Sequence, residues 1–425
     1  MATRASKRRK VKDTNGSRSN SLPEDRVFPN DASVAASADD KRKWQGFCEI
    51  ENDPAFFNVM IQEFGVQGVK VQEVFGLDEA LLAMLPKPVY GLIFLFRYVE
   101  DDFIQQESTC PEHVWFSNQT TGNACATVAL LNIIMNIPDI ELGENLRSFK
   151  DFTQDFTPAT RGEQIVHYEF VKNIHNSFAR KIDMMNIDLN MKNDATSKSK
   201  ASKSASKKSK NNDAAFHFIA FMPIAGEVWK LDGLDRQPQR LEKIEEGMDW
   251  LEVVAPNLEA RMAQYEEGQI EFGLLSLVRD PLLDHRQHLA ENIKLIRACE
   301  DRLAQVNPDW NAFAITEDGA GDSVLTGPSS EYSLTIADIL QANIPTATQR
   351  RINADDDITT LIDLRQKAVT DQAGLRAAIR DEEMTAAADR EKAESRRHDY
   401  GPAIQTWLRM LAEEGVLKDL IQEVG

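Results

Sequence analysis

The chain has 425 residues, of which 42% are hydrophobic and 8% aromatic, and its formal net charge is −19. This length exceeds that of most single compact domains, and the apolar content is sufficient for at least one large core. The acidic balance excludes a general nucleic-acid binder, and we expect no sequence-specific nucleic-acid binding, although a basic partner or substrate segment would suit an acidic enzyme.

Residues 1–41 are predicted to be a disordered basic and polar tail, because they are rich in Ser, Asp, Asn, Lys and Arg and poor in large apolar residues. The cluster SKRRKVK (6–12) is either a nuclear-import signal or a solvated basic tail. No apolar segment typical of a signal peptide follows the basic start of the chain. Order is expected to begin at Trp44.

Residues 42–280 are predicted to form one folded domain. Asp53 and Pro54 are typical of a helix start and Gly65 of a helix end. The continuous apolar run at 89–98 indicates a strand buried on both faces, too short to cross a bilayer. The predicted elements are a helix at 53–65, strands at 68–74 and 89–98, a helix at 123–136, mostly helical structure at 142–180, and strands at 215–223 and 227–233.

A Lys/Ser-rich segment, TSKSKASKSASKKSKNND (196–213), interrupts this domain. Its low complexity cannot build a core, so a long mobile loop is expected over 181–213. The two strands that follow are expected to be joined by a tight turn around Ile224 to Gly226.

The character of the chain changes at Pro281. An amphipathic helix is predicted at 281–306, followed by a partly disordered linker at 307–356 that is rich in Asp, Gly, Ser and Thr. Residues 357–425 are predicted to form a helical domain, with a long charged helix at 358–397 whose narrow apolar stripe needs a partner. In the last helix, one face packs either on the protein itself or on a partner protein, and carries Ile404, Trp407, Leu408 and Leu411.

Cysteine use indicates free thiols. The spacings match neither a zinc site nor a dense disulfide framework, so we expect a reducing intracellular compartment. We also expect no membrane association, because the longest apolar runs are too short to span a bilayer. The four cysteines are Cys48, Cys110, Cys125 and Cys299.

Cys125 stands where a loop becomes an apolar helix, within NQTTGNACATVALLNIIMN (118–136). A helix N-terminus stabilises a thiolate, because its unpaired N–H groups and macrodipole lower the thiol pKa. Gly122 and Asn123 break the preceding structure, and the alanines on either side of Cys125 leave its sulfur approachable. The position fits a catalytic nucleophile, whereas most cysteines are small buried hydrophobes, and position alone leaves both readings open.

A cysteine hydrolase also needs a base, and His217 is the outlier among seven histidines because it lies inside the apolar strand AFHFIAF. Such a histidine is usually a satisfied core residue, but Asp232 ends the next strand. If a two-residue hairpin loop joins the strands, both residues share a face, with Cβ atoms about 5 to 8 Å apart. A carboxylate there can orient the imidazole and stabilise its charged form, whereas an odd-length loop would separate them.

Gln119 is the fourth candidate, six residues before Cys125. A side-chain amide just upstream of a nucleophile can donate to a developing oxyanion, beside the backbone N–H of Cys125. The alternative for Gln119 is an ordinary loop glutamine, but four residues of suitable types in suitable places favour a catalytic site.

Several stretches together resemble a known family. QTTGNACAT (119–127) and FHFIAFMPIAGEVWKLDGL (216–234) resemble the ubiquitin C-terminal hydrolase family of cysteine proteases. The tail RRHDYGPAIQTWLRMLAEEGVLKDLI (396–421) resembles the adaptor-binding tail of its long forms. Further stretches in the right order are WQGFCEIENDPAFFNVMIQEFGVQGVKVQEVFGL (44–77), PVYGLIFLFRY (88–98), LRSFKDFTQDFTPATRG (146–162) and HNSFAR (175–180).

The resemblance implies an α/β (α+β) papain-like fold with a central antiparallel sheet, flanking helices, a knotted backbone and a helical C-terminal extension. It implies Cys125 as nucleophile, His217 as general base and acid, Asp232 as its orienting partner, and Gln119 in the oxyanion hole. No cofactor or metal is implied. The predicted loop at 181–213 falls where the family has its active-site crossover loop, beneath which the tail of ubiquitin passes.

The implied activity is thiol-dependent hydrolysis at the C-terminal glycine of ubiquitin and its conjugates, in the cytoplasm and nucleus. The tail at 396–425 would bind an adaptor, either a proteasomal ubiquitin receptor or a chromatin adaptor of a histone deubiquitinase. The short linker favours the proteasome type, while the tail looks as close to the chromatin type. A ubiquitin-binding scaffold that needs no turnover is the rival hypothesis.

Overall fold

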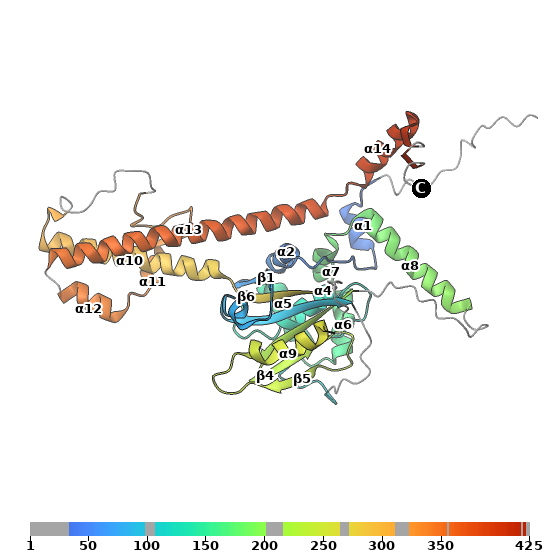
Figure 1. Cartoon of the computed structure of the whole chain (residues 1–425), viewed down its shortest axis with the longest axis horizontal. Helices are drawn as coiled ribbons and strands as arrows, with labels where there is room; N and C mark the ends of the chain where they lie inside the picture. The colour runs from blue at the N-terminus through green and yellow to red at the C-terminus, as the bar shows by residue number, and fades with distance from the viewer. Residues whose placement is uncertain are drawn as a thin grey trace, which may run out of the picture. The chain divides into compact units, whose positions relative to one another are not determined.

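The computed structural model describes residues 34–97, 107–200, 216–263, 272–310, 323–354, 357–417 and 420–421 (Figure 1). The chain divides into two compact units, Ala36–Asp399 and a second unit composed of Met1–Ala35 and Tyr400–Gly425, which are described separately. Within the described ranges, no helix combines the length and the apolar character required to cross a membrane.

A six-stranded sheet lies at the centre of the first unit, and its neighbouring strands are all antiparallel in the order β1-β6-β2-β3-β4-β5. The strands are β1 Val69–Glu73, β2 Val89–Arg97, β3 Phe216–Ile224, β4 Glu227–Leu231, β5 Gln239–Lys243 and β6 Phe272–Arg279.

Helices cover both faces of this sheet. Along β2, Ile93 packs into a core with the helices α2 and α4, whereas Leu92 and Phe94 pack into a second core with α9. This arrangement explains the continuous apolar run of β2, since alternate side chains enter opposite cores. The helices around the sheet are α2 Pro54–Phe64, α3 Glu79–Ala83, α4 Cys125–Ile134, α5 Gly143–Thr153, α6 Pro158–His167, α7 Glu169–Asn176 and α9 Trp250–Met262.

The sheet and its helical layers confirm the predicted class, α/β with a central antiparallel sheet flanked by helices. The helix predicted at 53–65 is confirmed, with Asp53 accepting a hydrogen bond from Ala55 N–H and Gly65 in the left-handed region. The helical character of 142–180 and the four predicted strands are confirmed as far as they are described. The knotted backbone and the domain boundaries stay predictions.

The β3–β4 hairpin has the two-residue loop on which the site prediction depended. Ile224 pairs with Glu227, so only Ala225 and Gly226 lie between the strands. Both have positive φ, 52° and 80°, as a type I′ turn requires. His217 and Asp232 therefore lie on the same face of the hairpin as diagonal neighbours.

The prediction of a disordered tail over 1–41 is wrong for its last residues, because helix α1 Ala38–Lys43 precedes Trp44. A capping box between Ser37 and Asp40 starts this helix, and Lys41 Nζ donates to Ser177 O at 2.7 Å. These contacts stabilise helix α1, and the polar composition of the segment gives no indication of them. Residues 1–33, including the basic cluster, lie outside the described residues.

The loop predicted over 181–213 is also wrong in its first part, because Lys181–Lys200 forms the helix α8. Arg180 makes two hydrogen bonds at 3.0 Å to the carboxylate of Asp183 in the first turn, and Met184 is buried. These contacts attach the first turn of α8 to the folded domain, which stabilises this segment as a helix. Residues 201–215, the remainder of the predicted loop, lie outside the described residues.

A helical extension follows β6, as predicted. The helices α10 Pro281–Val306 and α13 Ile358–Arg397 confirm the predictions at 281–306 and 358–397, and they lie side by side (Figure 1). The segment predicted as a linker instead contains α11 Ile336–Gln341 and α12 Thr346–Ala354. Its order comes from distant partners, because fully buried Tyr332 accepts a hydrogen bond from Arg376 Nε of α13 at 3.0 Å.

The described helix of the second unit is α14 Gly401–Glu413, and it buries none of its residues. Trp407 is 61% exposed, and Ile404 and Leu408 beside it are exposed as well. Of the four residues of the predicted apolar face, Ile404, Trp407 and Leu408 are therefore exposed, and Leu411 is partly exposed.

Candidate active site

Cys125 is the first residue of α4, so its thiol lies at the N-terminus of a helix, as expected. Asn123 precedes it with a φ of 62° and donates a hydrogen bond from Nδ2 to Phe47 O at 3.2 Å. Ala124, at the N-cap, offers no side-chain cap. The first-turn N–H groups are thus left for a thiolate or an oxyanion.

The half-buried Cys125 opens onto a cavity of about 500 Å³. Besides the start of α4, the lining comes from the loop before α2, which includes Glu49 and Glu51, from Leu95 of β2, from the start of β3, from the first turns of α8, and from Arg396 at the end of α13. The cavity is therefore built from parts of the chain that are far apart in sequence.

His217 and Asp232 are in direct contact on the β3–β4 hairpin. His217 Nε2 and Asp232 Oδ1 are 2.7 Å apart, and both residues are only 4% exposed. The backbone N–H of Leu234 donates to the same carboxylate oxygen at 3.0 Å. Because Nε2 is engaged, Nδ1 of His217 is left for its hydrogen bond with Cys125. The structure thus brings three of the four candidate residues into one chain of contacts.

The pKa of His217 reflects this chain of contacts. Burial lowers the pKa of His217, but the hydrogen bonds to Asp232 and Cys125 raise it by more than burial lowers it. The resulting pKa is about 9. Burial raises the pKa of Asp232, while the hydrogen bond and charge of His217 and the charge of Lys230 lower it below its usual range. An imidazolium at neutral pH, paired with a carboxylate, stabilises a thiolate on Cys125.

Gln119 contacts the loop that follows β4 and is absent from the lining of the Cys125 cavity. Its backbone N–H donates to Gly233 O at 2.8 Å, directly beside Asp232. Its side-chain Nε2 donates to Thr121 O at 2.9 Å and keeps a second N–H, while its buried Oε1 has no hydrogen-bond partner. A Cβ on Gly233 would lie 3.1 Å from both N and Cβ of Gln119, so glycine permits this close approach.

Two supporting residues were missed at the sequence level. Lys230 is 2% exposed, and its Nζ lies 2.9 Å from Asp235 Oδ2 and 3.4 Å from Asp232 Oδ2, the carboxylate oxygen that His217 does not use. Asn118 donates from Nδ2 to Gly233 O at 3.3 Å and Asp235 O at 2.6 Å. The period of two along β4 puts Lys230 and Asp232 on one face, a signal that could have identified the lysine.

Other titratable groups have structural roles. Burial lowers the pKa of His175 to about 4, and its ring nitrogens contact Thr127 Oγ1 at 2.7 Å and Cys48 O at 2.8 Å. This neutral histidine ties the catalytic helix to the core. Within the described ranges, no cluster of three or more His, Cys, Asp and Glu residues is placed to hold a metal ion.

Alkylation should distinguish the four free thiols. Burial raises the pKa of Cys48 to about 12 and that of Cys299 to about 11, and it also raises the pKa of Cys110. We therefore expect iodoacetamide to modify Cys125 about tenfold faster than the other three cysteines, as measured by peptide mass spectrometry over time. Replacing His217 with Ala should slow this reaction, and equally fast modification of Cys110 would contradict the assignment.

Comparison with known proteins finds one family of similar sequences. The family model "Ubiquitin carboxyl-terminal hydrolase, family 1" matches residues 47–263. The Caenorhabditis elegans ubiquitin carboxyl-terminal hydrolase ubh-4 is 33% identical over 276 residues, which cover 64% of this chain and 78% of the relative. The Dictyostelium discoideum ubiquitin carboxyl-terminal hydrolase isozyme L5 is 33% identical over 301 residues, covering 70% of this chain and 81% of the relative.

A longer relative and a solved structure are similar as well. The Xenopus tropicalis ubiquitin carboxyl-terminal hydrolase BAP1 is 30% identical over 316 residues, covering 68% of this chain but 43% of the relative. The crystal structure of Trichinella spiralis UCH37 bound to ubiquitin vinyl methyl ester is 31% identical, with a TM-score of 0.45, covering 57% of this chain and 86% of that chain.

Proposed function

Because the chain belongs to the ubiquitin carboxyl-terminal hydrolase family and is a thiol-dependent deubiquitinase, we propose that Cys125, His217, Asp232 and Gln119 perform its chemistry. One observation carries this assignment: buried His217 contacts Asp232 through Nε2 at 2.7 Å and is also hydrogen-bonded to Cys125. A scaffold has no physical need for such a chain of contacts, so turnover is favoured over binding alone.

In the proposed mechanism, the Cys125 thiolate attacks the carbonyl carbon of the C-terminal glycine of ubiquitin. The second N–H of the Gln119 amide and the backbone N–H of Cys125 stabilise the oxyanion. His217 Nδ1–H protonates the leaving amine, and the acyl-enzyme forms. The neutral imidazole then takes a proton from water, which hydrolyses the acyl-enzyme and regenerates the thiolate.

The charges around Cys125 suit this substrate. Glu49, Glu51 and Asp183 line the same cavity as the thiol and outnumber its two arginines, Arg180 and Arg396, and the whole chain is acidic. The C-terminal tail of ubiquitin is basic, so these carboxylates would attract it. The experiment is hydrolysis of ubiquitin with a fluorogenic C-terminal leaving group. Turnover supports the assignment, whereas tight ubiquitin binding without turnover would support the scaffold.

The uncovered face of α14 is the proposed adaptor surface. Ile404, Trp407 and Leu408 present an exposed apolar stripe, as a helix that binds a partner groove requires. We favour a proteasomal ubiquitin receptor over a chromatin adaptor of a histone deubiquitinase, because the chain has a short linker and spans 81% of the isozyme L5 relative but 43% of BAP1. A cytoplasmic and nuclear location is proposed, supported by the basic cluster at 6–12.

Deleting residues 401–425 should abolish adaptor binding and leave hydrolysis of the fluorogenic ubiquitin substrate within about twofold of wild type. The cut falls after the predicted start at 396, because Arg396 and Asp399 belong to the first unit and make contacts within it. Binding to each candidate adaptor would be measured by calorimetry, beside the matched point variant Trp407→Ser. Undiminished binding by the deleted protein would refute the proposed surface.

A further inference from the structure

The end of α13 reaches the cavity that contains Cys125. Arg396 lines this cavity, and its side chain is only 11% exposed. Its Nε donates to Glu51 Oε1 at 2.6 Å, and its Nη1 donates to Phe178 O at 2.7 Å and to Asp183 Oδ2 at 3.3 Å. A residue of the C-terminal extension is thereby part of the wall around the nucleophile.

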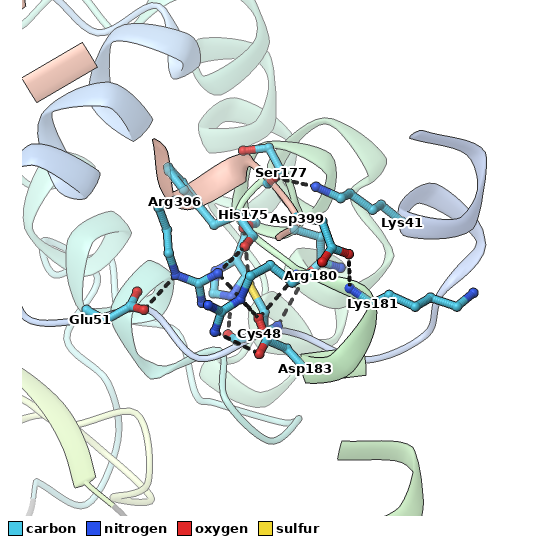
Figure 2. A network of polar contacts seen from close by, with 12 residues as sticks. Lys41, Cys48, Glu51, His175, Ser177, Arg180, Lys181, Asp183, Arg396 and Asp399 are labelled. Atoms are coloured by element: carbon cyan, nitrogen blue, oxygen red, sulfur yellow. Dashed lines mark hydrogen bonds and ion pairs between the residues drawn. The ribbon is translucent and has the colours of Figure 1, made fainter. Parts of the chain in front are cut away.

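The partners of Arg396 lie on two different walls. Glu51 belongs to the loop before α2, whereas Asp183 belongs to the first turn of α8. The guanidinium therefore spans from one wall to the other, and Arg180 holds the same Asp183 from the α8 side at 3.0 Å (Figure 2). A planar guanidinium with several fixed donors suits such a bridge, since it fixes both distance and direction.

Asp399 makes a second contact with α8 from the same segment. Its Oδ2 accepts a hydrogen bond from the backbone N–H of Lys181, the first residue of α8, at 3.0 Å (Figure 2). The first N–H groups of a helix lack partners within the helix, so a carboxylate there stabilises the helix start. A residue 218 positions later in the chain therefore caps α8.

We propose that Arg396 and Asp399 are positioning residues that hold α8 against the loop before α2 and so preform the cleft for the C-terminal peptide of ubiquitin. The inference rests on the proposed role of Cys125, since that thiol defines where the peptide must lie. A cleft already held in its bound form needs less ordering when substrate enters, which strengthens binding without altering the reacting groups. The two residues thus act on KM.

The neighbouring Arg397 provides a control that distinguishes positioning of α8 from attachment of α13 to the sheet domain. Its Nη2 contacts both carboxylate oxygens of Glu63 at 2.8 Å, and its guanidinium lies 4.7 Å from the ring centre of Phe178. These contacts attach the helix to the sheet domain, yet Arg397 is absent from the lining of the Cys125 cavity. The variant Arg397→Gln is therefore a matched control, with the same loss of charge on the next residue.

The test compares Arg396→Gln and Asp399→Asn with Arg397→Gln in the full chain, using the fluorogenic ubiquitin substrate. We expect the first two to raise KM about fivefold to tenfold with kcat within about twofold, and the control to leave KM within about twofold. Rescue of KM by Arg396→Lys should be incomplete, because an ammonium cannot span both walls. An unchanged or lowered KM, or an equal rise in the control, would overturn the proposal.

Hydrogen–deuterium exchange measures the positioning without turnover. The amides of residues 181–190 should exchange at least about threefold faster in Arg396→Gln and Asp399→Asn than in wild type or Arg397→Gln. Unchanged exchange there would overturn the proposal even if KM rose. An inactive wild type with this same exchange pattern would instead contradict the role of Cys125, so the two failures are distinct.

Discussion

Replacing Cys125 with Ala is expected to reduce hydrolysis of fluorogenic ubiquitin by roughly 10⁴-fold or more, because Cys125 is the only thiol or hydroxyl among the described residues that line the cavity. The substitution removes one half-exposed sulfur at the start of α4 and leaves the hydrogen bond between His217 and Asp232 in place. Ubiquitin affinity should therefore survive. Turnover would be measured by fluorescence, and binding to the inactive protein by calorimetry.

The matched control is Cys110→Ser, since Cys110 is also only partly buried but is absent from the lining of the Cys125 cavity, with Sγ 3.4 Å from Val114 O. It should retain activity within about twofold. Residual turnover by Cys125→Ala at more than about one per cent of wild type would remove Cys125 from the nucleophile's role. Loss of ubiquitin binding in a folded Cys125→Ala protein would instead show that the thiol contributes to binding.

Asp232→Asn should lower kcat/KM by roughly 10²- to 10⁴-fold and move the alkaline limb of its pH profile to lower pH. The limb moves to lower pH because the Asp232 carboxylate helps raise the pKa of His217 to about 9, whereas a neutral amide does not. The protonated imidazole, which donates to the leaving amine, is present only below its pKa. Wild-type activity should therefore decline near pH 9, and activity of the variant at lower pH.

Asp235→Asn is the control for this profile. Asp235 contacts Lys230 at 2.9 Å and lies in the same loop, but His217 contacts Asp232. The alkaline limb of the Asp235→Asn pH profile should therefore stay near that of wild type. An unmoved limb in Asp232→Asn would show that another group sets the pKa of the general acid. The measurement is kcat/KM between pH 6 and about pH 10 at constant ionic strength.

Much of the geometry of the candidate site could be predicted from the sequence because its determinants are local. The helix start at Cys125 is set by the residues around it, and the shared face of His217 and Asp232 follows from the two-residue turn at Ala225 and Gly226. Counting along a hairpin needs no knowledge of the remaining fold. The contact between Gln119 and Gly233 was beyond such counting, since it joins segments on different elements.

The failures share a different cause, which is stabilisation by residues far away in sequence. Composition predicted disorder where Tyr332 packs with Arg376, and a loop where Asp399 caps α8. The burial of Lys230 likewise depends on two aspartates that only the folded loop brings together. Polar segments of this kind become ordered through specific partners, and their own composition does not reveal those partners.

The contacts of Arg396 have a consequence for biosynthesis. The sheet is complete once Arg279 has been made, yet Glu51 must wait for a partner 345 residues later in the chain. At about 5–20 residues per second, the 120 residues from Arg279 to Asp399 take a ribosome roughly 6–24 s. A nascent chain can therefore bring Cys125, His217 and Asp232 together before Arg396 is available to hold the second wall of the cleft. Full affinity for ubiquitin is expected only after Asp399 has emerged.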